Sequence, residues 1–292
     1  MKILHEIVPI DGPVALTIGN FDGVHLGHQT LVQRLLATGL DTTLLTFSNH
    51  PSEVLFAQPS KQIIATGHKL ALLKELGVKT TFLLPFTEQF AEQSPQQFLS
   101  TLKKKVDFSH LILGHDAVIG HKREGDAAVL TKLSQELGFS LSYLSPVTVG
   151  GIPVSSSQIR ILIEEGRFAD IIPLLGRPYS IQGRVIQGNG RGKKLGFPTA
   201  NILLPKMALP RSGVYEVRVG KNRGIANIGI APTFGEKKEG MLEVHLLDYE
   251  KDLYGVLLDV ELVRFMREEK KFASAEALTE QIEQDIRNVE RA

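Results

Sequence analysis

Short apolar runs alternate with amphipathic segments through the first half of the chain, and this alternation limits the possible folds more than any other feature of the sequence. The runs have the length and composition of strands and lie at residues 14–18, 42–47, 80–86, 111–114 and 141–146. Apolar residues recur at helical spacing at residues 26–36, 68–76, 95–104 and 126–137. This pattern predicts an α/β domain with a parallel sheet. Such a sheet binds ligands beyond the carboxyl ends of its strands.

The first of these strand ends is followed by a glycine-rich segment with two histidines, residues 19–28. His25 and His28 lie three residues apart, so that both imidazoles can point at one site. If a helix begins near His28, its free N–H groups and the positive end of its dipole face that site, which suits a phosphate. Glycines here permit backbone shapes that other residues resist. The candidate binding residues of the segment are Gly19, Asn20, Phe21, Asp22, Gly23 and Gly27.

Two later strand ends also carry polar segments. His50 and Pro51 begin a loop after residues 42–47, and this pair is either a surface turn or part of a binding loop. Asp116 lies in the segment 114–126, which follows the fourth apolar run. We expect His50 and Asp116 at the ligand-binding edge of the sheet.

Three consecutive serines, residues 155–157, precede a helical pattern that contains Ile159, Leu162 and Ile163. Serine at a helix start caps free N–H groups, which explains part of this signal. Arg160 lies in the first turn, where the helix dipole favours an acidic residue, and a bound anion would resolve this conflict. Ser156, Ser157 and Arg160 are therefore candidate anion-binding residues. The alternative for Arg160 is a solvated surface charge.

The character of the sequence changes after Arg167. A short apolar helical segment ends at Gly176, and strands and turns follow, which predicts one domain of residues 1–176 and a second of residues 177–292. The second domain opens with a glycine-rich segment that suggests backbone amides folded around phosphates, although flexible hairpins look similar. Its candidate binding residues are Gly188, Gly190, Gly192, Lys194, Gly196 and Pro198.

The end of this segment has the sequence Gly-Phe-Pro-Thr-Ala-Asn, residues 196–201. Pro198 fixes the backbone before Thr199, and the Thr199 hydroxyl and the Asn201 amide can offer oxygen atoms to a hard cation. Mg²⁺ uses few protein ligands and completes its octahedron with phosphates and water. We therefore expect Thr199 and Asn201 to bind Mg²⁺ or a similar hard divalent cation.

A strand with one apolar face is predicted at residues 242–247, because Leu242, Val244 and Leu246 alternate with Glu243 and His245. Glu243 is either an exposed strand residue or a general base, since a carboxylate within reach of a hydroxyl is suited to accept its proton. The second domain is predicted to form a small antiparallel barrel with a C-terminal helix at residues 273–289. The charged run at 267–271 is most simply a solvated cluster.

The composition excludes several other classes of function. The 33 basic and 32 acidic residues leave no global charge excess that would attract nucleic acid or an anionic membrane. The chain contains no cysteine, which rules out disulfides, thiolate nucleophiles and cysteine zinc sites. It has neither a signal-peptide pattern nor an apolar run long enough for a membrane span. We therefore expect a soluble cytoplasmic protein that binds small molecules.

Residues 19–28 resemble the HxGH nucleotidyltransferases, and residues 196–201 resemble the signature of riboflavin kinases. In family order, almost the whole chain is similar to the bacterial bifunctional riboflavin kinase/FAD synthetases. The resemblance implies a Rossmann-like nucleotidyltransferase domain followed by an antiparallel β-barrel riboflavin kinase domain. The second domain would convert riboflavin to FMN with ATP and Mg²⁺, and the first would join FMN to AMP from a second ATP, releasing pyrophosphate. Riboflavin, FMN and FAD are then substrates or products.

The same resemblance implies roles for particular residues. His25 and His28 would bind ATP phosphates and stabilise charge on the transferred α-phosphoryl group, while Ser156, Ser157 and Arg160 would hold the β- and γ-phosphates. Glu243 matches the glutamate that accepts the proton of the ribityl hydroxyl. These implied catalytic residues are His25, His28, Arg160 and Glu243.

Four positions depart from the family pattern: Asn49 stands where relatives usually have proline, Ala231 where they often have arginine, and the other two bear on the activity of the first domain. Ala117 and Ile119 stand where relatives typically carry aromatic residues, and the loss of aromatic area would weaken contacts near the nucleotide or the flavin. One alternative is therefore a riboflavin kinase with a degenerate first domain. The other is a non-catalytic regulator that binds a flavin or a nucleotide.

Overall fold

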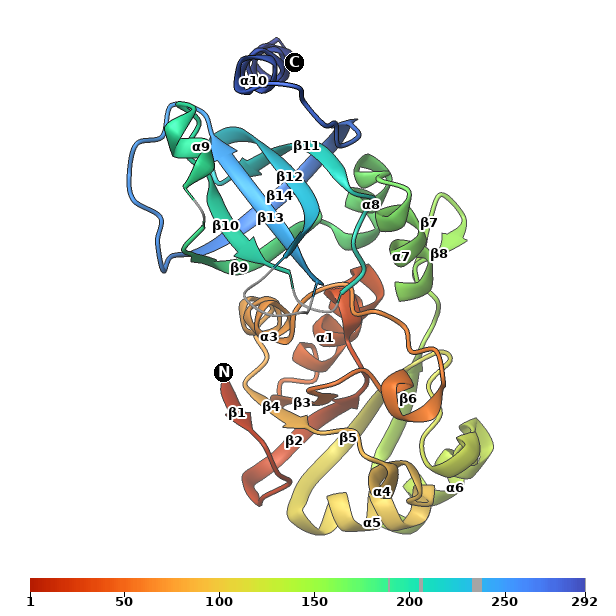
Figure 1. Cartoon of the computed structure of the whole chain (residues 1–292). Helices are drawn as coiled ribbons and strands as arrows, with labels where there is room; N and C mark the ends of the chain where they lie inside the picture. The colour runs from red at the N-terminus through yellow and green to blue at the C-terminus, as the bar shows by residue number, and fades with distance from the viewer. Residues whose placement is uncertain (189, 205–206, 233–237, 292) are drawn as a thin grey trace. The chain divides into compact units, whose positions relative to one another are not determined.

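A parallel sheet of six strands forms the centre of the first half of the chain, as the alternating pattern predicts (Figure 1). The structure is a computed structural model and describes residues 1–188, 190–204, 207–232 and 238–291. It divides into two compact units, residues 1–62 with 66–156, and residues 63–65 with those from 157 to the C-terminus. The domain boundary predicted between residues 176 and 177 stays a prediction, and the contact-based division lies earlier, between Ser156 and Ser157.

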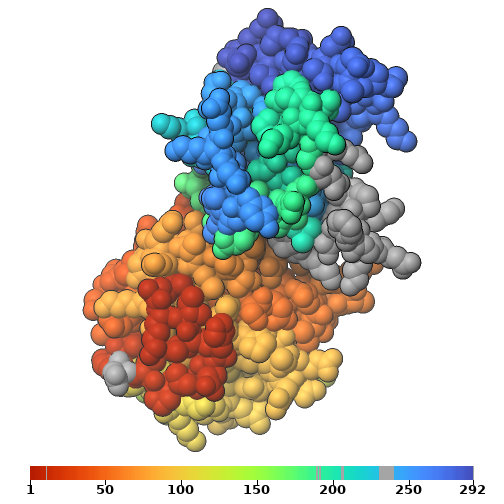
Figure 2. All heavy atoms as spheres, turned by 60° about the vertical axis from the view of Figure 1, so that its left-hand side comes forward, coloured from red at the N-terminus to blue at the C-terminus, as the bar shows by residue number. Residues whose placement is uncertain are grey.

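Every neighbouring pair of strands in the first sheet is parallel, and the order is β1-β4-β3-β2-β5-β6. The edge strand β1 was not expected, because it has only three residues and these lie largely at the surface (Figure 2). The strands are β1 Lys2–Leu4, β2 Ile10–Ile18, β3 Asp41–Phe47, β4 Thr80–Leu84, β5 Val106–Gly114 and β6 Ser140–Leu144.

The helices of the first unit begin and end close to the predicted residues. Ser94 starts α5 with a capping box, and Asp126 starts α6 by accepting a hydrogen bond from Val129 N at 2.9 Å. Leucine and phenylalanine side chains of α5 and α6 pack with Val14 and Leu16 of β2 in the main core. The elements are η1 Asp22–Val24, α1 Leu26–Leu36, α2 Ser52–Leu55, α3 Thr66–Glu75, α4 Glu88–Ala91, α5 Pro95–Lys105, η2 His121–Arg123 and α6 Ala127–Leu137, followed by a hairpin of β7 Thr148–Val149 and β8 Ile152–Pro153.

The second unit is built on a closed antiparallel barrel of order β10-β13-β12-β11-β14-β9, which confirms the predicted architecture. Leu242, Val244 and Leu246 are buried, so that every second residue from 242 to 246 faces the interior. The elements are α7 Ser156–Glu164, α8 Phe168–Leu175, β9 Ser180–Ile186, α9 Arg191–Lys194, β10 Ala200–Leu203, β11 Gly213–Val219, β12 Asn222–Pro232, β13 Lys238–Leu246, β14 Leu257–Arg267 and α10 Ala275–Glu290.

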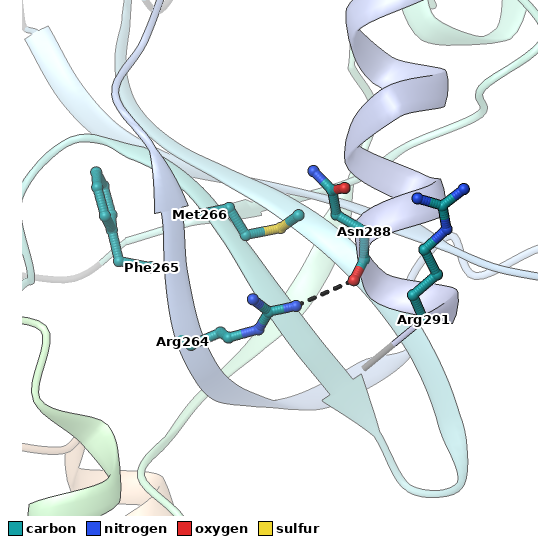
Figure 3. Close-up of a pocket in the computed structure, with 5 residues that line it drawn as sticks. All are labelled: Arg264, Phe265, Met266, Asn288 and Arg291. Atoms are coloured by element: carbon teal, nitrogen blue, oxygen red, sulfur yellow. Dashed lines mark hydrogen bonds between the residues drawn. The ribbon is translucent and has the colours of Figure 1, made fainter.

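Two arginines of the barrel strands bind the C-terminal end of helix α10 and attach this helix to the barrel. The carboxylate of Glu216, buried in β11, binds Arg223 at 3.2 Å and Arg264 at 2.6 Å. Arg223 in turn donates to the carbonyl of Val289, and Arg264 to that of Asn288 at 3.1 Å. Cations at this end satisfy terminal carbonyls and complement the helix dipole. A cavity of about 280 Å³ lies beside this contact, lined by Arg264, Phe265, Met266, Asn288 and Arg291 (Figure 3).

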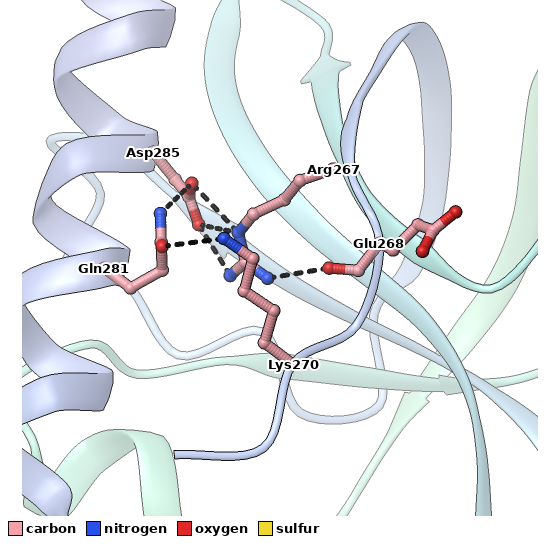
Figure 4. A network of polar contacts seen from close by, with 5 residues as sticks. All are labelled: Arg267, Glu268, Lys270, Gln281 and Asp285. Atoms are coloured by element: carbon pink, nitrogen blue, oxygen red, sulfur yellow. Dashed lines mark hydrogen bonds and ion pairs between the residues drawn. The ribbon is translucent and has the colours of Figure 1, made fainter. Parts of the chain in front are cut away.

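A second ion pair holds the middle of α10 (Figure 4). Arg267 Nη2 lies 2.8 Å from Asp285 Oδ2, and Arg267 Nε donates to the same carboxylate. The two side chains are only 15% and 3% exposed. The interpretation of residues 267–271 as a solvated cluster is therefore wrong for Arg267. The sequence pattern could not reveal this, because the partner lies 18 residues away on another element.

The Asp285→Asn variant should lower the free energy of unfolding of the second unit by about 3 kcal/mol, because it leaves the largely buried Arg267 without a counter-charge. Urea unfolding followed by circular dichroism measures this loss. The matched control is Glu283→Gln on the same helix, which breaks an ion pair with Arg287 whose side chains are 51% and 47% exposed. That change should cost less than about 0.5 kcal/mol. Equal losses in the two variants would contradict the importance assigned to the buried pair.

Candidate active sites

The two histidines of the first motif lie together at the carboxyl end of β2. Their rings stack with centroids 3.7 Å apart, and the ring of Phe21 lies 4.8 Å from that of His28. Gly27 permits this arrangement, because a Cβ atom there would lie 3.1 Å from Cε1 of His25. The three-residue spacing therefore brings both imidazoles to one place, as the sequence predicts.

Helix α1 begins between the two histidines, at Leu26. His25 is the N-cap residue, its side chain makes no capping hydrogen bond, and the first turn contains no acidic residue. The first N–H groups of α1 and the positive end of its dipole thus complement the imidazoles. An anion such as a phosphate fits this arrangement of donors.

The backbone that leads into α1 is strained. Phe21 has φ 54° and Val24 has φ 43°, and a positive φ is especially unfavourable for a β-branched residue such as valine. Hydrogen bonds from distant elements hold this loop in place: Ser156 Oγ donates to the Asp22 carbonyl at 3.0 Å, and Thr46 Oγ1 donates to the Asn20 carbonyl at 3.0 Å. Strain maintained by such contacts is typical of functional loops.

A buried lysine that the sequence analysis missed completes this support. Lys69 of α3 is 4% exposed, and its Nζ donates to Asn20 O at 3.1 Å, Thr46 Oγ1 at 3.2 Å and Phe47 O at 2.8 Å. Its position four residues before the buried Leu73 places a charged residue on the core face of the helix. That placement was the available sequence signal.

Two pKa shifts follow from this environment. Burial lowers the pKa of Lys69 to about 8, although the carboxylate of Asp22 acts in the opposite direction. Burial, together with the charges of His25 and Lys69, places the pKa of His28 well below its usual value. At neutral pH the His28 ring is therefore uncharged while Lys69 carries its proton. The Nδ1 atom of His28 is buried and has no hydrogen-bond partner among the described residues.

The other candidate residues from the first half of the sequence lie at several separate places. Gly19 donates its N–H to Leu45 O at 3.1 Å, so the segment continues directly from the sheet. His50 Nδ1 contacts Ser52 Oγ at 2.6 Å in the turn before α2, and Asp116 lies exposed after β5. Ile119 is buried in the main core and Ala117 packs against it, so these two positions contribute to packing. Ser157 and Arg160 lie on α7, whose residues from Ser157 onward belong to the second unit, and their roles stay predictions.

In the barrel, Asn201 lies directly opposite Glu243 across the pair β10–β13. Glu243 is also the register partner of Asn227 across β12–β13. Directly opposed residues share a face of a sheet, and the neighbours Leu242 and Val244 fill the interior, so these three side chains lie on the outer face of the barrel. Asn227 was not predicted, although it belongs to the alternating pattern of its strand.

The glycine-rich loop approaches both predicted metal ligands. A Cβ atom on Gly188 would collide with the amide of Asn201, and one on Gly192 would lie 3.3 Å from Oγ1 of Thr199. His245 donates from Nδ1 to the Pro198 carbonyl at 2.8 Å, which gives this histidine a structural role. Gly190 and Gly196 have φ 66° and 88°, and Lys194 is exposed at the end of α9.

The oxygen atoms gathered on this face suit a hard cation. Thr199 offers a hydroxyl, Asn201 an amide oxygen and Glu243 a carboxylate, and Mg²⁺ prefers such ligands with phosphate oxygens and water. In the described part of the chain, no group of three histidine, cysteine, aspartate or glutamate residues forms a metal cluster.

The described helices also include none that is long and apolar enough to cross a membrane.

Comparisons with known proteins find two family regions in this chain. A family model described as FAD synthetase matches residues 8–158, and one described as riboflavin kinase matches residues 175–292. The chain is 39% identical over 302 residues to the bifunctional riboflavin kinase/FMN adenylyltransferase of Escherichia coli K12, covering 98% of this chain and 96% of that protein. The corresponding protein of Buchnera aphidicola subsp. Schizaphis graminum is 36% identical over 301 residues, covering 99% and 96%.

A solved structure also resembles this chain along its whole length. It is described as a macrolide-efflux protein from Streptococcus pneumoniae, has a TM-score of 0.85 and 27% sequence identity, and the match covers 100% of both chains. The efflux description applies to that protein.

The pKa of Lys69 predicts how stability depends on pH. Between pH 8 and pH 10 the unfolded chain keeps a proton on this lysine that the folded protein has lost, so raising the pH favours the folded state. The free energy of unfolding should rise by up to about 1.4 kcal/mol per pH unit relative to a Lys69→Met variant. Urea unfolding at pH 8, 9 and 10 measures both proteins. Parallel pH profiles would show that the pKa of Lys69 is not lowered.

Proposed function

This chain belongs to the family of bifunctional riboflavin kinase/FMN adenylyltransferases, and on that premise we propose how its residues carry out the two reactions. The observation that carries the proposal is the pairing of two separate sites in one chain. The stacked histidines at the uncapped start of α1 suit phosphate chemistry in the first unit. The row of Asn201, Glu243 and Asn227 suits phosphate chemistry in the second unit.

In the first unit, a phosphate oxygen of FMN attacks the α-phosphorus of ATP. The bond between the α-phosphorus and the bridging oxygen breaks, and pyrophosphate leaves with that oxygen. His25, His28 and the first N–H groups of α1 stabilise the negative charge that spreads over the transferred group. Asn20, Phe21, Asp22 and the glycines of the loop position the nucleotide. Ser156 binds the departing phosphates, and the family resemblance assigns the same role to Ser157 and Arg160.

In the second unit, a ribityl hydroxyl of riboflavin attacks the γ-phosphorus of ATP, and ADP leaves. Glu243 accepts the hydroxyl proton, because it lies on the outer face of the barrel beside Asn201. The amides of the glycine-rich loop hold the phosphates. Lys194 provides a nearby positive charge, and Pro198 fixes the backbone before Thr199.

Thr199 and Asn201 would hold Mg²⁺, and the close approach of Gly188 to the Asn201 amide supports this assignment. When bound, the cation neutralises charge on the phosphate oxygens. We place the enzyme in the cytoplasm, with riboflavin, FMN and ATP as its small-molecule partners and with no nucleic-acid or membrane partner. His50 and Asp116, each after the end of a strand, are proposed to contact the flavin and the nucleotide at the edge of the sheet.

A kinase with a degenerate first domain was the nearest alternative, because of Ala117 and Ile119. The core position of Ile119 favours retention of the adenylyltransferase instead, since this residue anchors the loop in the main core, where Phe98 and Phe108 supply aromatic area. A pure binding protein would not need His25, His28 and Glu243 together. We therefore propose that both reactions proceed in this chain.

Incubation of the purified protein with riboflavin, ATP and Mg²⁺, followed by chromatographic separation of the flavins, tests the proposal. FMN should appear first and FAD should follow. The Glu243→Gln variant should lose at least about 100-fold in kinase turnover and still convert added FMN to FAD, whereas His28→Ala should lose FAD formation alone. Comparable loss of both activities from either substitution would contradict independent sites, and FMN without FAD in the wild type would support the degenerate-domain alternative.

A Gly188→Ala variant tests the geometry of the kinase site. The added methyl group must displace the Asn201 amide, so that kinase turnover should fall by roughly 10- to 100-fold. Formation of FAD from added FMN should stay within twofold of the wild type. Gly67→Ala is the matched control, because a Cβ atom there meets nothing within 4 Å and lies in helix α3. A fully active Gly188→Ala enzyme would remove the structural support for Asn201 as a ligand.

A further inference from the structure

Lys69 is a charged residue whose burial the proposed chemistry does not yet explain. The side chain comes from α3 of the first unit, and only 4% of the residue is exposed. Removal of an ammonium group from water is costly unless the group is fully hydrogen-bonded. All three of its N–H bonds have acceptors, on Asn20, Thr46 and Phe47.

These acceptors are the ends of two neighbouring strands. Phe47 is the last residue of β3, and Asn20 follows β2 by two residues. Lys69 therefore links the point where β3 ends to the point where the histidine loop begins. Thr46 Oγ1 strengthens the link, because it accepts from Lys69 and donates to the same Asn20 carbonyl.

The charge of Lys69 also acts on the site itself. It interacts electrostatically with His28 and with Asp22, the titratable groups that face it from α1 and η1. The net charge of the chain is only +1, so that the positive potential at this loop must come from local groups. A purely apolar residue of similar shape would fill the same space without the cost of burying a charge.

We propose that Lys69 is a positioning residue for adenylyl transfer, whose ammonium group fixes the histidine loop to the end of β3 and adds positive potential behind the phosphate site. It acts through the loop and through His28 and does not touch the substrate. This inference rests on the proposed function of the first unit. It adds a residue from outside the motif to the machinery of that reaction.

The test uses the full-length enzyme, with the kinase of the same chain as an internal control. In Lys69→Met, turnover for FAD formation from FMN and ATP should fall by roughly 10- to 100-fold, while riboflavin phosphorylation stays within twofold. Lys69→Gln, which keeps a donor for the Asn20 carbonyl but has no charge, answers the same question if the methionine variant does not fold. Lys79→Met, which removes an exposed lysine from the same unit, should change neither activity.

A spectroscopic readout separates positioning from a purely structural role. The Cε1 proton of His28, assigned by its absence in His28→Gln, is titrated by NMR in the wild type, in Lys69→Met and in Thr46→Val. Loss of the lysine charge should move the His28 midpoint to higher pH, whereas Thr46→Val keeps the charge and should leave it in place. An unchanged midpoint together with wild-type FAD formation in the uncharged variants would overturn the proposal.

The outcomes also distinguish this proposal from the proposed function. If the wild type makes FAD and Lys69→Met makes it at the same rate, the role of Lys69 is wrong and the function stands. If the wild type makes FMN but no FAD, the adenylyltransferase function is wrong, and the proposal for Lys69 falls with it. A shifted His28 midpoint with slowed FAD formation supports both.

Discussion

Each unit contains buried charged groups, and the cost of removing such a group from water means that its binding partners must be held in place. Lys69 is buried with three acceptors, Glu216 with two arginines, and Asp285 with Arg267. Each group is tolerated only because its partners are held in place by separate elements, so each also ties those elements together. In the first unit this tie holds the histidine loop to the sheet. In the second it holds the C-terminal helix to the barrel.

The first unit concentrates positive features at one edge of a parallel sheet. Parallel pairing brings the ends of β2 and β3 together. The uncapped start of α1 follows the end of β2 after the histidine loop. Two imidazoles, free helix N–H groups and the ammonium of Lys69 then act on the same small volume. On the proposed function, this concentration lets a chain with a net charge of only +1 bind a triphosphate. The strained loop between β2 and α1 is the cost of that concentration.

The second unit uses the register of antiparallel strands for the same purpose. Alternation fills the barrel with apolar side chains and leaves Asn201, Glu243 and Asn227 in one row outside. The glycine loop approaches this row at Gly188, where a Cβ atom would collide with the amide of Asn201. A site that sits on rigid strands and is covered by a loop can keep its oxygen atoms in place while the loop admits nucleotide.

Local patterns in the sequence determined both architectures, most helix limits, the pairing of His25 with His28 and the outward direction of Glu243. These features depend on residue spacing along one element, which the sequence contains directly. The edge strand β1 and the burial of Lys69 and Arg267 were decided only by the tertiary structure. A three-residue strand has too little pattern to detect, and a buried charge depends on partners that lie far away in sequence, such as Thr46 for Lys69 and Asp285 for Arg267. Contacts of that kind become visible only once the chain has folded.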